Sequence, residues 1–113
     1  MNNFGVGTDI EDVDRFKNID NKKTFLNDIF TKNELEYCYS KENTASHLAA
    51  RYAGKEAVIK ALDNKKIDIN KIEILNDKNG KISVFIDGEN NKKIKCSISH
   101  TDSVAIAFVI IEE

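Results

Sequence analysis

The sequence has no proline and little cysteine: its 113 residues contain only Cys38 and Cys96. Without proline, the expected helices must end at polar, turn-prone segments such as residues 63–66. The two cysteines fit neither a CxxC motif nor a Cys/His ligand pattern, so neither structural zinc nor a disulfide is predicted. We interpret both thiols as reduced packing residues of a cytoplasmic protein.

Long apolar runs and an excess of one charge are also lacking. No apolar stretch is long enough to cross a membrane, and no basic region followed by an apolar run indicates a signal peptide near Met1. The formal net charge of −2 argues against a broad nucleic-acid-binding face. A content of 41% hydrophobic and 32% charged residues is typical of a globular protein. We expect one domain over residues 1–113 that buries roughly two-thirds of its unfolded surface.

Apolar periodicity predicts an α+β fold that begins with a strand over residues 4–10 and ends in an antiparallel β-meander. Between them, helices are expected over 11–16, 22–30, from a capping box at 31–34 onward and, as the long central helix, over about 43–62. Alternating apolar residues then predict strands at 72–75, 82–86 and 94–98. The last strand, 104–111, is apolar on both faces, as in a central strand or a subunit interface.

The long central helix has a carboxylate on its apolar face. The positions that share one stripe of this helix, and that should face the core, are Leu48, Tyr52, Ile59 and Leu62. Glu56 lies inside this stripe, where an unpaired carboxylate is costly to bury. Lys60 follows one turn later, in the favourable orientation for an ion pair with Glu56. Glu56 therefore has either Lys60 as an internal partner or a ligand, and the helix alone does not decide between them.

Other polar residues have two interpretations each. Asp9, near the end of the first strand, is either a helix N-cap or a ligand directed into a cleft. His100 is either a solvated turn residue or, flanked by hydroxyl residues, part of a site. Arg15 and Arg51 are the only arginines, and arginine is the better clamp for phosphate and carboxylate groups.

Three motifs follow one another along the chain: GVGTDI at residues 5–10, RYAGKEAVIKAL at 51–62 and SISHT at 97–101. An FT-x-x-E segment lies at 30–34 and an ND-x-x-GK turn at 76–81. In this order, over nearly the whole chain, they resemble the holo-acyl-carrier-protein synthases, a family of small phosphopantetheinyl transferases. No single motif is decisive, but the ordered set is specific.

The resemblance implies the phosphopantetheinyl transferase fold and a Mg²⁺-dependent reaction. In that reaction 4′-phosphopantetheine passes from coenzyme A to a serine of apo-acyl carrier protein, in support of fatty acid biosynthesis. The products are holo-acyl carrier protein and adenosine 3′,5′-bisphosphate. The resemblance assigns Asp9 and Glu56 as catalytic metal carboxylates. Lys60 is implied as a catalytic contact to the pyrophosphate, and either Glu56 or a metal-bound water would take the serine proton.

The same resemblance implies substrate and partner contacts. Arg51, His100 and Thr101 would lie near the phosphates of coenzyme A, beside Lys60. Arg15 would dock the acidic carrier protein. The family's small members are homotrimers with coenzyme A between neighbouring subunits, which agrees with the two-faced apolar strand at 104–111.

Two other hypotheses stay open. A non-catalytic relative that binds coenzyme A or a carrier protein is favoured by the acidic neighbours of Arg15 and by the polar segment 63–66. A structural or interaction domain would need Glu56 and Lys60 only as an internal ion pair.

Overall fold

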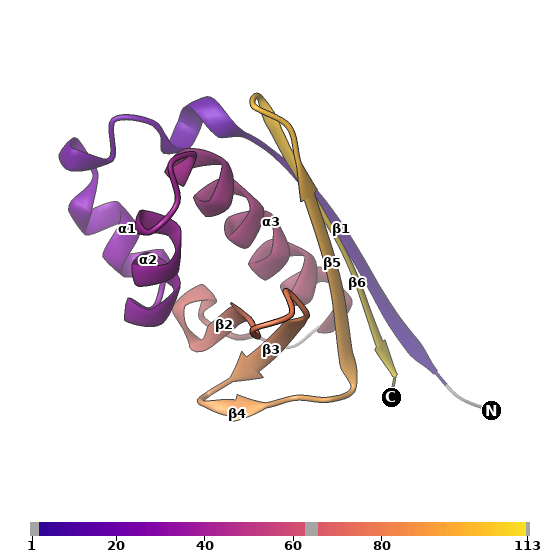
Figure 1. Ribbon diagram of the computed structural model, residues 1–113. Helices are drawn as coiled ribbons and strands as arrows, with labels where there is room; N and C mark the ends of the chain where they lie inside the picture. Colours follow the sequence, from indigo (N-terminus) through magenta and orange to yellow (C-terminus); the bar gives the residue numbers. More distant parts are fainter. Residues whose placement is uncertain (1–2, 63–65, 113) are drawn as a thin grey trace.

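The computed structural model describes residues 3–62 and 66–112. Within these residues the chain forms an α+β fold with three α-helices and two antiparallel three-stranded sheets (Figure 1). The helices are α1 (Lys23–Ile29), α2 (Lys32–Tyr39) and α3 (Thr44–Leu62), and short 3₁₀ turns span Val13–Phe16, Ile19–Asn21 and Ile69–Lys71. The strands are β1 (Phe4–Asp12), β2 (Ile72–Asn76), β3 (Ile82–Ile86), β4 (Glu89–Asn90), β5 (Ile94–His100) and β6 (Val104–Glu112).

The strands are divided between two sheets, where the sequence predicted a single meander after the helices. The first sheet has the order β1-β6-β5 and the second the order β2-β3-β4. In the first sheet the N-terminal strand therefore pairs with the last one, and β6 is central. The fold class is confirmed, and the meander is interrupted between β4 and β5.

The first strand continues further than predicted. Its ladder with β6 runs from Phe4 opposite Glu112 to Asp12 opposite Val104, and the N–H of Val13 still donates to the carbonyl of Ser103. The helix expected over residues 11–16 is therefore reduced to the 3₁₀ turn Val13–Phe16. Because Asp9 lies within the strand, its interpretation as a helix N-cap is wrong.

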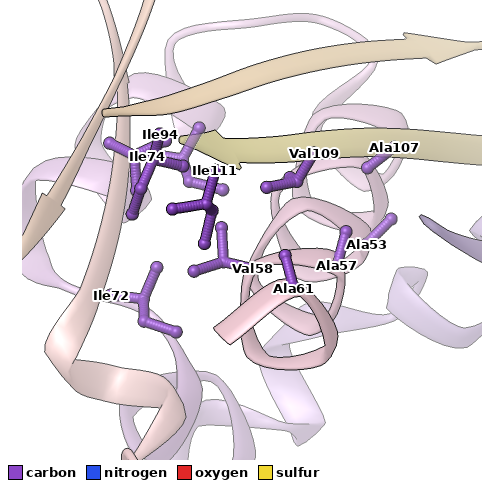
Figure 2. Close-up of a cluster of buried hydrophobic side chains, with 11 residues drawn as sticks. Ala53, Ala57, Val58, Ala61, Ile72, Ile74, Ile94, Ala107, Val109 and Ile111 are labelled. Atoms are coloured by element: carbon purple, nitrogen blue, oxygen red, sulfur yellow. The ribbon is translucent and has the colours of Figure 1, made fainter. Parts of the chain in front are cut away.

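Helix α3 lies across one face of the β1-β6-β5 sheet (Figure 1), and glycine allows it to approach β1 closely. A Cβ at Gly7 would lie 1.9 Å from the carbonyl oxygen of Ala57, and one at Gly5 would lie 2.0 Å from that of Ala61. No side chain fits there, so the two glycines bring the backbones of β1 and α3 together. Small side chains on α3 also allow close contact with β6, as Figure 2 shows for Ala53, Ala57 and Ala61.

The predicted apolar stripe of α3 is only partly correct. Leu48 is fully buried, but Tyr52 and Ile59 are half-buried, whereas Arg51 and Lys55 are almost completely buried. The helix is covered on more than one side, because the first sheet packs on one face and α2 and β2 pack against another. One stripe therefore does not describe its buried surface. Of the polar segment expected to end α3, residues 63–65 lie outside the described residues.

Helix α2 begins at the predicted capping box, in which Thr31 and Glu34 bond each other's backbone N–H. Glu34 also forms a fully buried ion pair with Lys55 of α3, at 2.6 Å. The Lys55 ammonium donates to the carbonyls of Ile29, Ile69 and Ile72, and the N–H of Ile74 donates to Glu34. This pair joins α2, α3 and β2. The sequence analysis did not find it.

Among the described residues, no helix combines the length and the apolar character that a membrane-spanning segment needs.

Candidate active site

Asp9 and Lys60 meet where β1 crosses α3. The Lys60 ammonium lies 3.4 Å from Asp9 Oδ1 and donates to the carbonyl of Thr8 at 3.0 Å. The Asp9 side chain is only 13% exposed, whereas that of Lys60 is 55% exposed. Asp9 Oδ2 is buried and has no hydrogen-bond partner among the described residues. The Lys60 side chain of this pair therefore stays partly exposed to solvent. One carboxylate oxygen of Asp9 has no hydrogen-bond partner among the described residues.

Glu56 lies one turn before Lys60 on α3 and is half-buried. Within the described part of the chain, no ion pair joins Glu56 to Lys60, because Lys60 turns toward Asp9. Of the two alternatives for Glu56, the internal ion pair with Lys60 is thus not formed among the described residues. Burial raises the pKa of Tyr52, and the charges of Glu56 and Glu11 raise it further. Tyr52 therefore lies near both carboxylates.

Glu11 is a member of this acidic group that the sequence analysis did not assign. Its pKa is raised to about 7, mainly by burial and also by the neighbouring Asp9, while Arg15 opposes both effects. Successive odd positions of a strand point to one face, so Asp9 and Glu11 share a side of β1. The two-residue spacing of Asp9 and Glu11 could have indicated that they share a face. It was not recognised, because the strand was expected to end near Asp9.

Arg15 borders the acidic group from the 3₁₀ turn after β1. Its guanidinium lies 3.1 Å from Glu11 Oε1 and 4.8 Å from the centre of the Tyr52 ring. Nearly half of its side chain, 46%, stays exposed. Arg15 is therefore held by internal partners but remains open to a partner molecule.

The acidic group fits a divalent cation. Asp9 Oδ2 has no hydrogen-bond partner among the described residues, and Glu11, whose pKa burial and Asp9 raise, lies on the same side of β1. Oxygen ligands from one or two carboxylates, completed by waters and substrate phosphates, suit Mg²⁺. No cluster of three or more His, Cys, Asp or Glu side chains with metal-binding geometry occurs in residues 3–62 and 66–112.

The other predicted site residues lie around the end of β5. His100 is half-buried there, and its ring centre lies 5.1 Å from that of His47 on α3. Thr101 accepts hydrogen bonds from the N–H groups of Ser103 and Val104, at 3.2 and 3.1 Å, and so closes the turn into β6. His47 was missed in the sequence analysis, where no pattern distinguished it.

Arg51 is not an open clamp in this structure. It is 1% exposed, donates to Asn76 Oδ1 and lies 4.3 Å from the centre of the Tyr37 ring. Its Nε is buried without a hydrogen-bond partner among the described residues. Its role near a phosphate stays a prediction.

The sheet register separates the two groups of site residues. Glu11 and His100 both lie opposite Ala105 of β6, from its two sides. Two strand spacings, about 10 Å, therefore lie between their backbones. Helix α3 contributes to both groups. Lys60, in its last turn, contacts Asp9 of β1, and His47, in its first turn, contacts His100 at the end of β5. Each chain thus carries Asp9, Glu11, Glu56 and Lys60 at its β1 edge, and His47 and His100 at its β5 edge.

A family model described as the 4′-phosphopantetheinyl transferase superfamily matches residues 5–109. The chain therefore belongs to this superfamily, as the ordered motifs predicted. It is 49% identical over 110 residues to the holo-[acyl-carrier-protein] synthase of Thermodesulfovibrio yellowstonii, and the match spans 95% of this chain and 96% of that protein.

Two solved structures have the same fold. A holo-(acyl-carrier-protein) synthase from Bacillus anthracis, in complex with CoA (3′,5′-ADP), has a TM-score of 0.80 and 28% identity, with 96% of each chain covered. The holo-[acyl-carrier-protein] synthase of Helicobacter pylori, in complex with coenzyme A, has a TM-score of 0.77 and 25% identity, covering 96% of this chain and 99% of that one. These similarities confirm the predicted fold.

Proposed function

We propose that this chain is a holo-acyl-carrier-protein synthase. It transfers 4′-phosphopantetheine from coenzyme A to a serine of apo-acyl carrier protein and releases adenosine 3′,5′-bisphosphate, in support of fatty acid biosynthesis. The observation that carries the proposal is the Asp9–Lys60 contact, which puts an unsatisfied carboxylate oxygen and an exposed ammonium side by side. Membership of the transferase superfamily supports it.

The reaction assigns a role to each residue. The serine hydroxyl oxygen bonds to the phosphorus that carries pantetheine. The bond from this phosphorus to the bridging oxygen breaks, and the electron pair leaves with adenosine 3′,5′-bisphosphate. Lys60 binds the pyrophosphate and offsets its charge. The serine proton passes to Glu56 or to water, and we leave both open.

We assign Mg²⁺ to Asp9 and Glu56. When bound, it would supply positive charge to the pyrophosphate and hold it in the orientation for attack. Isothermal titration of the protein with Mg²⁺ and coenzyme A together, compared with Asp9→Asn, tests the assignment. Equal metal binding by both proteins would contradict it.

The direct test of the function uses a mixture of the protein, coenzyme A, Mg²⁺ and apo-acyl carrier protein. Intact-mass spectrometry of the carrier should show one phosphopantetheine adduct, and adenosine 3′,5′-bisphosphate should appear in equal amount. Absence of the adduct with several carriers would overturn the proposal.

Coenzyme A is expected to bind between neighbouring subunits of a homotrimer, with its phosphates near Arg51, His100 and Thr101. The separation of the two groups of site residues supports this arrangement, because the β1 edge of one copy would complete the β5 edge of the next. The sheet face away from α3 exposes large apolar side chains, each 47–65% accessible: Phe4, Val6, Ile10, Ile106 and Phe108. Such a patch is typical of an interface. Sedimentation equilibrium showing a monomer at micromolar concentration would contradict the trimer.

We also propose that Arg15 docks the acidic carrier protein and that the reaction is cytoplasmic. The exposed part of the Arg15 guanidinium supports the first point. The free thiols of Cys38 and Cys96 agree with a reducing compartment. Cell fractionation with an antibody against the chain tests the second.

One observation favours a second candidate, a relative that binds coenzyme A or a carrier without turnover. Glu11 forms an ion pair with Arg15 and so offsets the charge that would attract an acidic partner. In the transfer assay, coenzyme A binding without an adduct would support this candidate.

A further inference from the structure

The two histidines of this chain are in contact, although 52 residues separate His47 from His100. Their ring centres lie 5.1 Å apart with an interplanar angle of 67°, an edge-to-face arrangement. His47 has a second neighbour, Tyr37 of α2, at 5.7 Å and 74°. Both distances lie in the favourable range for aromatic pairs. His47 therefore sits between Tyr37 and His100 and connects α2 to the end of β5.

The surroundings of His47 are cationic. Arg51 lies over Tyr37 at 4.3 Å and Lys41 at 5.0 Å from the ring centre. The pKa of His47 is lowered to about 4, mainly by burial and also by the charges of His100, Arg51 and Lys41. His47 is therefore neutral at physiological pH. Its ring gives His100 an aromatic packing surface.

We propose that His47 is a positioning residue, whose uncharged ring holds the His100 imidazole in the orientation that receives an anionic phosphate group of coenzyme A. The inference rests on the proposed function, which puts His100 beside that phosphate. It goes further than the proposed function because it states that a residue of α3, His47, fixes the orientation of the His100 ring. A freely rotating His100 would lose part of its binding free energy when the phosphate fixes it.

The first experiment uses the full chain without ligand. Because there are only two histidines, their ring carbon–proton NMR signals are assigned by comparing wild type with His47→Phe and His47→Ala. We expect His47→Ala to shift and broaden the His100 signals, because the neighbouring ring is gone. His47→Phe should restore a single sharp set, because an aromatic edge is again present. Unchanged His100 signals in His47→Ala would overturn the inference.

The second experiment measures transfer at varied coenzyme A. Loss of an aromatic pair in His47→Ala should raise the KM for coenzyme A about 3- to 10-fold and leave kcat within about 2-fold. His47→Phe should stay within about 2-fold of wild type in both constants. His47→Leu, which fills the space without a ring, should resemble His47→Ala and serves if the alanine variant is unstable. Leu62→Ala, another truncation on α3, should lower stability without changing this KM.

Several outcomes would overturn the inference. One is a His47→Phe variant as impaired as His47→Ala, since the imidazole itself would then be required. Another is an unchanged KM in His100→Ala, since His100 would then not meet the phosphate. If wild type transfers nothing, the proposed function fails. In that case the binding constant for coenzyme A is measured by calorimetry in the same variants and replaces KM. Equal binding constants in wild type and His47→Ala would then overturn the inference independently of the proposed function.

Discussion

Two lysines on α3, five positions apart, have opposite surroundings. Lys55 is 0% exposed and its ammonium contacts Glu34 and three backbone carbonyls. Lys60 is 55% exposed and contacts Asp9 and one carbonyl. Burial lowers the pKa of Lys55 and raises that of Glu34, and in each case the partner's charge opposes the change. The first pair is closed and joins three elements, whereas the second remains open to a ligand.

This difference is the one expected between a charge that stabilises the fold and a charge that serves the proposed reaction. A buried ion pair with complete hydrogen bonding has no capacity left for a substrate, and removing one partner leaves the other uncompensated. At Asp9 the reverse holds, because Oδ2 is buried without a partner in the described part of the chain, while Lys60 reaches into solvent. We therefore expect variants of the Lys55 pair to lose stability and variants of the Asp9 group to lose activity.

The largest effect is expected for Asp9→Asn. Removing this charge should lower Mg²⁺-dependent transfer by a factor on the order of a hundred or more, because a main electrostatic contributor is lost. If both carboxylates hold one Mg²⁺ as proposed, the variant with both Asp9→Asn and Glu56→Gln should be little worse than either alone. Initial rates at several Mg²⁺ concentrations check this. Multiplied losses in the double variant would show that the carboxylates act independently.

Lys55→Met should be the most destabilising change on α3. It leaves the Glu34 carboxylate buried without its cation, which costs about 3–5 kcal/mol of unfolding free energy. Urea unfolding followed by circular dichroism measures this loss. Replacing Glu34 by Gln and Lys55 by Met together should recover part of it. A Lys55→Met protein as stable as wild type would show that Lys55 does not stabilise the fold, and it would then not differ from Lys60 in this respect.

A smaller effect is expected for Arg15→Glu. A surface charge at the rim of a docking site acts mainly on encounter, so the KM for the carrier should rise several-fold at low salt and less at high salt. The KM for coenzyme A should change less. Lys17→Glu, at an exposed ion pair with Asp14, is a matched control. Unchanged carrier kinetics at low salt would remove Arg15 from the docking surface.

The smallest effect is expected on the pH dependence of stability, through His47. Burial favours the neutral form of this histidine on α3. Its pKa is lowered from 6.5 to about 4 in the folded protein, so below pH 6.5 the unfolded chain binds more protons. This contribution to stability is complete above pH 6.5 and is lost as the pH falls toward 4. Wild type should therefore lose stability relative to His47→Phe over this range, as measured by urea unfolding at each pH. Parallel pH profiles would contradict the prediction.

Most of the elements could be predicted from the sequence, because periodicity and capping motifs are local. Asp9 and Lys60, which the family resemblance assigned to one site, are in contact. The extension of β1 to Asp12 could not be predicted, because it depends on pairing with β6 at the other end of the chain. The burial of Lys55 was hidden for the same reason, since its partner Glu34 belongs to another helix. Lys55 and Lys60 are alike in sequence until the tertiary structure distinguishes them.

The neighbours Lys55 and Glu56 allow the most direct test of the central claim, that α3 carries one charge for stability and the next for the reaction. The measurement is Glu56→Gln, assayed for unfolding free energy without metal and for Mg²⁺-dependent transfer. Our account predicts unchanged or slightly higher stability, because an uncompensated carboxylate is removed, and transfer lower by a factor on the order of a hundred or more. Near-normal transfer at limiting Mg²⁺, with reduced stability, would contradict it and make Glu56 a structural charge like Lys55.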